Sequence, residues 1–180
     1  MPLRQHAKRA PLRQLRVSAR TPDEGSLRMR IELDGVPPAA ATWPTGIALR
    51  GFTAADARPL HRLLEHGYRD GGGHVAPFPA WLEATIGDAD FDPQLCFLAL
   101  AGEQLAGAAL CWRSAFVKDL VVDESWRRRG LGEQLLRHVF ATFAARGAAK
   151  VELKLEPTNE AALRLYTRVG MVVVERPHER

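Results

Sequence analysis

The chain has 180 residues, of which 46% are hydrophobic and 26% are charged, and these proportions are typical of one globular domain with a substantial core. No apolar run approaches the roughly 20 residues that a membrane-spanning helix needs, and two cysteines, Cys96 and Cys111, do not make a disulfide framework. The composition therefore excludes a membrane-spanning protein and a disulfide-rich secreted domain, and no group of Cys, His and carboxylate residues has the spacing of a metal site.

The net charge of +4 belongs largely to the N-terminal end of the chain. Residues 1–20 carry six Arg and Lys residues and no acidic residue, so the remainder has a charge of about −2 (+4 − 6). We predict that residues 1–26 form a basic, flexible tail, with a transit peptide as the alternative. The tail has neither the apolar run of a secretory signal nor aromatic residues that stack on bases. We therefore expect a cytoplasmic protein whose partner is neither a membrane nor a nucleic acid.

Residues 27–46 are predicted to contain a strand and a linker. The strand, Leu27–Leu33, alternates apolar and polar side chains, and the linker after it is rich in proline. The main domain is expected to occupy 47–180, with strands at 46–52, 95–101, 105–112, 116–122, 151–155 and 171–174. Helices are expected at 53–67, 79–86, 131–146 and after Asn159, with a flexible glycine loop at 71–74. Hairpins mixed with crossover helices predict a mixed α/β fold.

The segment that follows the 116–122 strand has the pattern of an anion site. Arg127-x-x-Gly130-x-Gly132 lies between an apolar strand end, Leu120–Val122, and the start of a predicted helix. The first amides of a helix have no partner within the helix, and glycines let an anion approach them. The arginines from Arg127 to Arg129 add positive charge, although a solvated helix start also explains them. A Rossmann fingerprint and a P-loop are both absent, so the pattern predicts a pyrophosphate held mainly by backbone amides.

A second group of polar residues follows the 151–155 strand. Asn159 begins a helix, and Tyr166 lies two helical turns later on the same face. Each of them also has a purely structural explanation, because Asn159 can cap the helix and Tyr166 can lie at the edge of the core.

These motifs together resemble the GNAT superfamily of acyl-CoA-dependent N-acetyltransferases. The resemblance rests on Leu120-Val-Val122, Arg127-x-x-Gly130-x-Gly132, Asn159-x-x-Ala-x-x-x-Tyr166 and Val169-Gly170-Met171, and it extends from about Ile47 to Val174. It implies a mixed, mostly antiparallel sheet flanked by helices, and acetyl-CoA as cosubstrate without a metal. It also implies acetyl transfer to the primary amine of a small-molecule or peptide acceptor, by direct attack through a tetrahedral intermediate.

The resemblance assigns roles to particular residues. Tyr166 is expected to protonate the departing thiolate, because a phenol is protonated at neutral pH. The general base stays open among Asp119, Glu65, His66 and a water relay. The acceptor site is expected to include Glu65, Tyr68 and Trp81. The residues expected to bind the coenzyme are Leu120, Val121, Val122, Arg127, Arg128, Arg129, Gly130, Leu131, Gly132, Glu133 and Asn159.

One feature departs from the family pattern. GNAT domains usually end in a hairpin whose last strand lies between the strands that correspond to 151–155 and 171–174, and the sequence after Val174 offers no such strand. We predict that Leu27–Leu33 fills this gap, either within one chain or by exchange between the two chains of a homodimer. This junction also resembles the second repeat of tandem proteins of the mycothiol-synthase type.

Three alternatives to a complete enzyme stay open. They are a non-catalytic GNAT-like module that binds acyl-CoA, a half that needs a partner GNAT domain, and a protein that binds nucleic acid through its basic tail.

Overall fold

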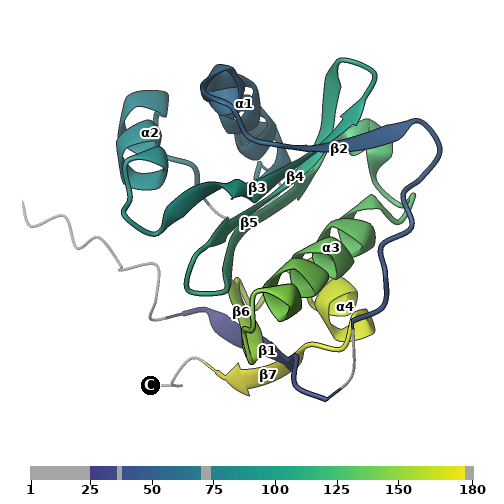
Figure 1. The fold of residues 1–180 in the computed structure, drawn as a ribbon. Coiled ribbons are helices and arrows are strands. Elements are labelled where there is room, and N and C mark those ends of the chain that lie inside the picture. The colour runs from purple at the N-terminus through teal and green to yellow at the C-terminus, as the bar shows by residue number, and fades with distance from the viewer. Residues whose placement is uncertain (1–24, 36–37, 70–73, 177–180) are drawn as a thin grey trace, which may run out of the picture.

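The computed structural model describes residues 25–35, 38–69 and 74–176. Its strands form one seven-stranded sheet in the order β2-β3-β4-β5-β6-β1-β7 (Figure 1). The strands are β1 (Leu27–Glu32), β2 (Ile47–Gly51), β3 (Phe91–Ala101), β4 (Gln104–Trp112), β5 (Phe116–Val122), β6 (Lys150–Leu155) and β7 (Val172–Glu175). The helices are α1 (Ala57–Gly67), α2 (Phe78–Ile86), α3 (Leu131–Ala145) and α4 (Glu160–Arg168), with the 3-10 helices η1 (Ala54–Asp56) and η2 (Glu124–Trp126).

Neighbouring strands are antiparallel except for β5 and β6, so the predicted mixed and mostly antiparallel sheet is confirmed. The helices cover the sheet from two sides, with α1 and α2 on one side and α3 and α4 on the other (Figure 1). Each side has its own apolar core, and α3 contributes Leu135, Leu136 and Val139 to the larger one. Most of the predicted basic tail, and the predicted glycine loop from Gly71 to Gly73, lie outside the described residues.

The strand β1 occupies the gap that the sequence analysis identified. It pairs along β6 from Leu27↔Leu155 to Glu32↔Lys150, and on its other side it pairs with β7. Its apolar residues face the core, where Leu27 is 5% and Met29 is 1% exposed. The prediction that this strand fills the gap is therefore confirmed, and in this structure the strand comes from the same chain.

We expect Met29→Ala to lower the free energy of unfolding by about 3 kcal/mol, because it removes a buried side chain from the strand that joins β6 to β7. Urea unfolding measures this change. The control is Glu32→Ala at the exposed end of the same strand, which is expected to change stability by less than about 0.5 kcal/mol. Equal stabilities of wild type and Met29→Ala would mean that β1 is not part of the folded domain.

The helix predicted from Thr53 begins as one 3-10 turn, η1, because Asp56 ties this segment to β2. Its carboxylate accepts hydrogen bonds of 2.7 Å from both terminal nitrogens of Arg50, and another of 2.7 Å from the backbone N–H of Thr53. Asp56 is buried, and these bonds, with that of Arg50 the strongest, lower its pKa to about 2.

This carboxylate makes a pH-dependent contribution to stability. Because the pKa of Asp56 is lower in the folded chain than in the unfolded chain, its ionised carboxylate stabilises the fold at every pH above the usual carboxyl pKa. This stabilisation is lost as the pH falls through about 2. We therefore expect Asp56→Asn to cost about 2 kcal/mol at neutral pH and progressively less below about pH 4. Urea unfolding of both proteins across this range measures the difference. A difference that stays constant with pH would contradict this account, and Glu103→Gln in the exposed β3–β4 turn is the control.

The strand β3 begins four residues earlier than predicted. The sequence analysis placed its start at Leu95, yet Phe91 pairs with Trp112 of β4. The register shifts between Phe91 and Cys96, so the proline lies in an irregular stretch where it is tolerated. The carbonyl of Pro93 also accepts a hydrogen bond of 3.3 Å from Phe52 N–H.

Candidate active site

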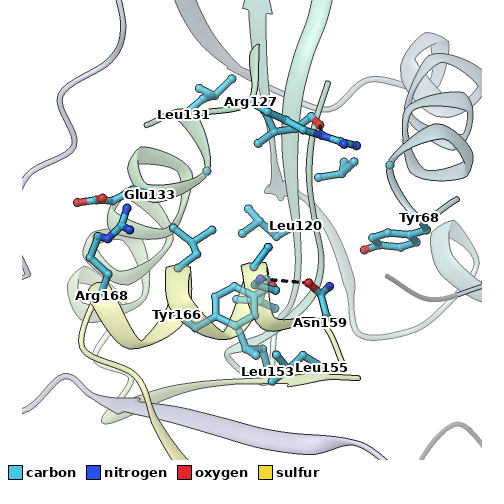
Figure 2. A pocket seen from close by; sticks show the side chains of 18 of the residues that line it. Tyr68, Leu120, Arg127, Leu131, Glu133, Leu153, Leu155, Asn159, Tyr166 and Arg168 are labelled. Carbon is cyan, nitrogen blue, oxygen red and sulfur yellow. Dashed lines mark hydrogen bonds between the residues drawn. The ribbon is translucent and has the colours of Figure 1, made fainter. Parts of the chain in front are cut away.

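The parallel strands β5 and β6 separate after two paired positions. The pairs are Phe116↔Glu152 and Val117↔Leu153, and beyond them the described residues of the two strands show no further pairing. A pocket of about 510 Å³ opens between the two strands. Its walls come from β5, β6, α4 and the start of α3, with the end of α1 contributing Tyr68 (Figure 2). The separation leaves backbone N–H and C=O groups of both strand edges facing the pocket, where an extended ligand can form hydrogen bonds with them.

One end of the pocket is built from the turn that follows β5. Arg128 and Gly130 both have left-handed backbone conformations, with φ of 60° and 80°, and such residues bend successive N–H groups into an anion-binding concavity. The helix α3 starts at Leu131, and no described side chain caps this start. The amides of its first turn have no partner within the helix, and the helix dipole adds partial positive charge there. The turn and the start of α3 therefore have the backbone geometry that the predicted anion site requires.

The two glycines of this turn serve different purposes. Gly130 supplies the positive φ that an L-residue adopts only with strain. Gly132 lets α4 approach α3, because a Cβ built on it would lie 3.3 Å from Leu165 Cδ2 and 3.5 Å from Val122 Cγ2. A larger side chain at either position would change the shape of the anion site.

The three arginines of the turn lie in different environments. Arg127 donates from Nε to the carbonyl of Val122 at 3.3 Å, and its side chain reaches over the pocket (Figure 2). Arg129 stacks over the ring of Trp126, with Cζ 4.9 Å from the ring centroid. Arg127 and Arg128 line the pocket, while Arg129 does not.

The apolar residues of β5 divide between the two faces of the sheet. Leu120 and Val122 pack against the core under α3, and Val121 packs against α1 on the other side. The contact with α1 is close, because a Cβ on Gly67 would lie 2.3 Å from Val121 Cγ2. The three residues that were predicted to bind a ligand therefore share a strand edge but no common side-chain face.

Two tyrosines approach the pocket from opposite sides (Figure 2). Tyr166 of α4 is 8% exposed, and burial together with the charge of Asp119 raises its pKa to about 12. Tyr68, just after α1, donates its hydroxyl proton to Asp119 Oδ1 at 2.9 Å. Burial and the same carboxylate raise the pKa of Tyr68 well above its usual value. Both phenols therefore hold their protons throughout the physiological range.

Asp119 is buried beside these phenols and is engaged through both oxygens. Oδ1 accepts from Tyr68, and Oδ2 accepts from Lys118 Nζ at 2.9 Å. Its side chain is not among the residues that line the pocket. Asp119, which was predicted as a candidate base, therefore does not face the pocket itself. It contacts Tyr68 and Lys118, which do.

Asn159 and Glu133 line the pocket, but each also has a structural contact. Asn159 Oδ1 accepts from the backbone N–H of Ala162 at 3.1 Å, which is the predicted helix cap (Figure 2). The amide nitrogen of Asn159 is not used by this cap. Glu133 accepts from Arg137 at 2.7 Å, one turn further along α3.

Two residues predicted for the acceptor site, Trp81 and Glu65, and the candidate base His66 do not reach the pocket. Trp81 is 4% exposed and packs in the core under α1 and α2, where its ring lies 5.2 Å from that of His61. Glu65 is exposed and lies 3.4 Å from His61 Nδ1. His66 Nδ1 lies 2.7 Å from the carbonyl oxygen of Arg62, which accepts its proton, on the exposed face of α1. Of the predicted acceptor residues, Tyr68 alone is brought to the pocket.

The pocket also contains residues that the sequence analysis did not select. They are Gly67, Val117, Lys118, Trp126, Leu153, Lys154, Leu155, Ala161, Ala162, Leu165 and Arg168. The alternation of Val151, Leu153 and Leu155 with lysines and a glutamate identifies β6 as a strand, but it does not show that β6 borders a cavity.

Among the described residues, no group of three or more His, Cys, Asp or Glu side chains could hold a metal ion. None of the helices in these ranges combines the length and apolar character of a membrane span.

Comparisons with known proteins give a consistent result. The sequence matches the model of the acetyltransferase (GNAT) family over residues 58–171. It is 36% identical over 88 residues to N-alpha-acetyltransferase 30 of Xenopus laevis, a match that covers 44% of this chain and 32% of that protein. It is 37% identical over 140 residues to mycothiol acetyltransferase of Clavibacter michiganensis subsp. michiganensis, covering 71% of this chain and 43% of that protein.

A solved structure supports the same fold. The GCN5-related N-acetyltransferase from Sphaerobacter thermophilus superposes with a TM-score of 0.71 and 32% sequence identity, covering 82% of this chain and 48% of that one. The chain therefore spans between about a third and a half of the length of these three relatives.

Proposed function

This chain belongs to the acetyltransferase (GNAT) family, and from that premise we propose that it transfers an acetyl group from acetyl-CoA to the primary amine of an acceptor. The observation that carries the proposal is the pocket between β5 and β6, which joins an amide-lined anion site at one end to two protonated phenols at the other. An elongated ligand with a pyrophosphate and a reactive end has this same arrangement of groups.

The described residues fit acetyl-CoA in two respects. The amides from Arg128 to Gly132, with the charge of Arg127, would hold the pyrophosphate. The unpaired edges of β5 and β6 would accept an extended arm by strand-like hydrogen bonds, with Asn159 and Glu133 beside it. Acetyl-CoA supplies an acyl group that is activated as a thioester.

We assign to Tyr166 the donation of a proton to the departing thiolate. Its raised pKa of about 12 ensures that the proton is present at neutral pH, and its position on α4 directs the ring into the pocket. Such a donor assists direct attack of the amine through a tetrahedral intermediate, a route that needs no covalent enzyme intermediate.

Tyr68 is our candidate for contact with the acceptor amine. Its hydroxyl gives its proton to Asp119, so its oxygen is left to accept a hydrogen bond from an amine N–H. Since both oxygens of Asp119 are already engaged, we assign to Asp119 the positioning of Tyr68 and not direct removal of the amine proton. Water that reaches the pocket can carry that proton away.

The proposal is tested by incubating the full chain with acetyl-CoA and a panel of amines, and by measuring both free thiol and acetylated product. The panel contains small amines, amino acids and peptides with free N-termini or lysines. We expect product and thiol to form in equal amounts. Binding of acetyl-CoA without transfer to any amine would favour the alternative, an acyl-CoA-binding module or a half that needs a partner domain.

A further inference from the structure

We propose that Arg168 binds the ribose 3′-phosphate of the coenzyme, so that this chain discriminates CoA from dephospho-CoA, which lacks only that phosphate. The inference rests on the proposed function, and it adds a second anion subsite to the same pocket. Arg168 is an exposed residue in the last turn of α4, and its side chain lines the pocket. Neither the apolar core nor the proposed transfer of the acetyl group uses this residue.

The pocket-lining residues of α4 and its cap form two neighbouring rows on the helix surface. At spacings of three and four residues, one row consists of Asn159, Ala162 and Tyr166, and the other consists of Ala161, Leu165 and Arg168. The second row faces α3, because Leu165 Cδ2 would lie 3.3 Å from a Cβ built on Gly132. Arg168 therefore belongs to the row that faces α3 and the anion site.

Arg168 lies close to the anion site along α4. It follows Leu165 by three residues, which corresponds to about 4.5 Å along a helix axis. Since Leu165 packs over Gly132 in the first turn of α3, the side chain of Arg168 starts within one helical turn of the anion site. Figure 2 shows Arg168 beside Glu133 of α3, with Tyr68 on the opposite side of the pocket. The guanidinium is thus remote from the Tyr68 side of the reactive end.

The charge of Arg168 is not engaged by the described part of the chain. Within residues 25–35, 38–69 and 74–176, its guanidinium has no salt bridge or hydrogen bond. The carboxylate of Glu133 accepts hydrogen bonds of 2.7 and 3.1 Å from Arg137 instead. A cation in the last turn also suits the helix dipole, but that role does not require a position in a pocket lining. The planar guanidinium can therefore offer two parallel donors to a phosphate.

The order of groups in CoA determines which phosphate meets Arg168. The thiol and the pantetheine arm come first, the pyrophosphate follows, and the ribose with its 3′-phosphate and the adenine come last. The pyrophosphate is assigned to the amides from Arg128 to Gly132, with Arg127 and Arg128 at the pocket lining. With the thioester at the two phenols, the ribose end must continue past the anion site. The 3′-phosphate is the anionic group of CoA that is left for Arg168.

Isothermal titration with CoA and with dephospho-CoA tests the inference without turnover. We expect the wild-type chain to bind CoA about tenfold more tightly than dephospho-CoA, which is the size of one charge-assisted contact. Arg168→Gln should reduce this ratio to about twofold or less, because it weakens the binding of CoA and leaves that of dephospho-CoA unchanged. The wild-type ratio should also fall as the salt concentration rises from about 50 to 300 mM.

Arg164→Gln is the matched control. Arg164 lies one turn earlier on α4, pairs with Glu160 at 3.1 Å, has a side chain that is 67% exposed, and is not part of the pocket lining. The ratio should therefore match that of the wild type. Urea unfolding without ligand should be cooperative for both variants. In transfer assays, Arg168→Gln should raise the KM for acetyl-CoA about tenfold at unchanged kcat, because the 3′-phosphate is remote from the reacting atoms.

The outcomes separate the inference from the proposed function. Equal binding of CoA and dephospho-CoA by the wild type would overturn the inference and leave the acetyltransferase proposal intact. A preference for CoA that survives in Arg168→Gln would also overturn it. Equal weakening of both ligands in Arg168→Gln would assign the guanidinium to the pyrophosphate and not to the 3′-phosphate. Binding of neither ligand by the wild type would contradict the proposed function together with the inference.

Discussion

Replacing Tyr166 with phenylalanine is expected to lower kcat for acetyl transfer by about 10²- to 10³-fold, the usual contribution of a positioned general acid. The ring of Tyr166 is 8% exposed and packs in the main core, so phenylalanine preserves the packing and removes only the hydroxyl. The KM for acetyl-CoA should change by less than about twofold, because the anion site and the strand edges are untouched. Steady-state kinetics with any acceptor that the wild-type chain acetylates measures both values.

The control for this variant is Thr167→Val, since Thr167 is the exposed neighbour of Tyr166 on α4. It should leave both kcat and KM unchanged. The pH dependence gives a further test, because burial and Asp119 raise the pKa of Tyr166 to about 12. Loss of its proton therefore cannot reduce the rate below about pH 11. A Tyr166→Phe enzyme with the kcat of the wild type would show that another group, or water, protonates the thiolate.

Replacing Gly132 with glutamate is expected to weaken acetyl-CoA binding by at least about 100-fold. Gly132 lies in the first turn of α3, so the new carboxylate would stand beside the amides that are assigned to the pyrophosphate and would repel it. An acidic residue in the first turn of a helix favours the helix itself, so the loss of binding is not expected to come from unfolding. A thermal-shift titration with acetyl-CoA, in which ligand raises the melting temperature of the wild type, measures the change.

Gly132→Ala separates the effect of an added Cβ from the effect of the rest of the glutamate side chain. Its Cβ would lie 3.3 Å from Leu165 Cδ2, so it tests the close approach of α4 without adding charge. We expect Gly132→Ala to bind acetyl-CoA within about tenfold of the wild type, and Gly132→Glu to show no shift while its unfolding stays cooperative. Equal shifts for Gly132→Glu and the wild type would mean that the pyrophosphate lies elsewhere.

Local patterns were sufficient to predict most strands and the turn after β5. Alternating apolar residues identified β1. The resemblance to GNAT domains, which usually have one more strand at this place in the sheet, indicated where β1 belongs, as its pairing with β6 and β7 confirms. The glycine pattern after β5 predicted the turn, because a positive φ and a close approach both require residues without a Cβ. The strand pattern of β1 and the glycine turn depend on neighbouring residues, so the sequence contains them directly.

The contacts at the reactive end of the pocket could not be predicted in this way. Tyr68 and Asp119 are 51 residues apart, and only the packing of α1 against β5 brings them to 2.9 Å. Trp81 and Tyr68 look alike as aromatic residues near α1 and α2, yet one lies in the core and the other at the pocket.

We propose that the pocket between β5 and β6 holds acetyl-CoA. Isothermal titration of the full wild-type chain with acetyl-CoA tests it most directly. We predict saturable binding of one acetyl-CoA per chain, competition by CoA, and loss of the binding heat in Gly132→Glu. The absence of binding heat at millimolar acetyl-CoA, from a chain that unfolds cooperatively, would contradict the claim.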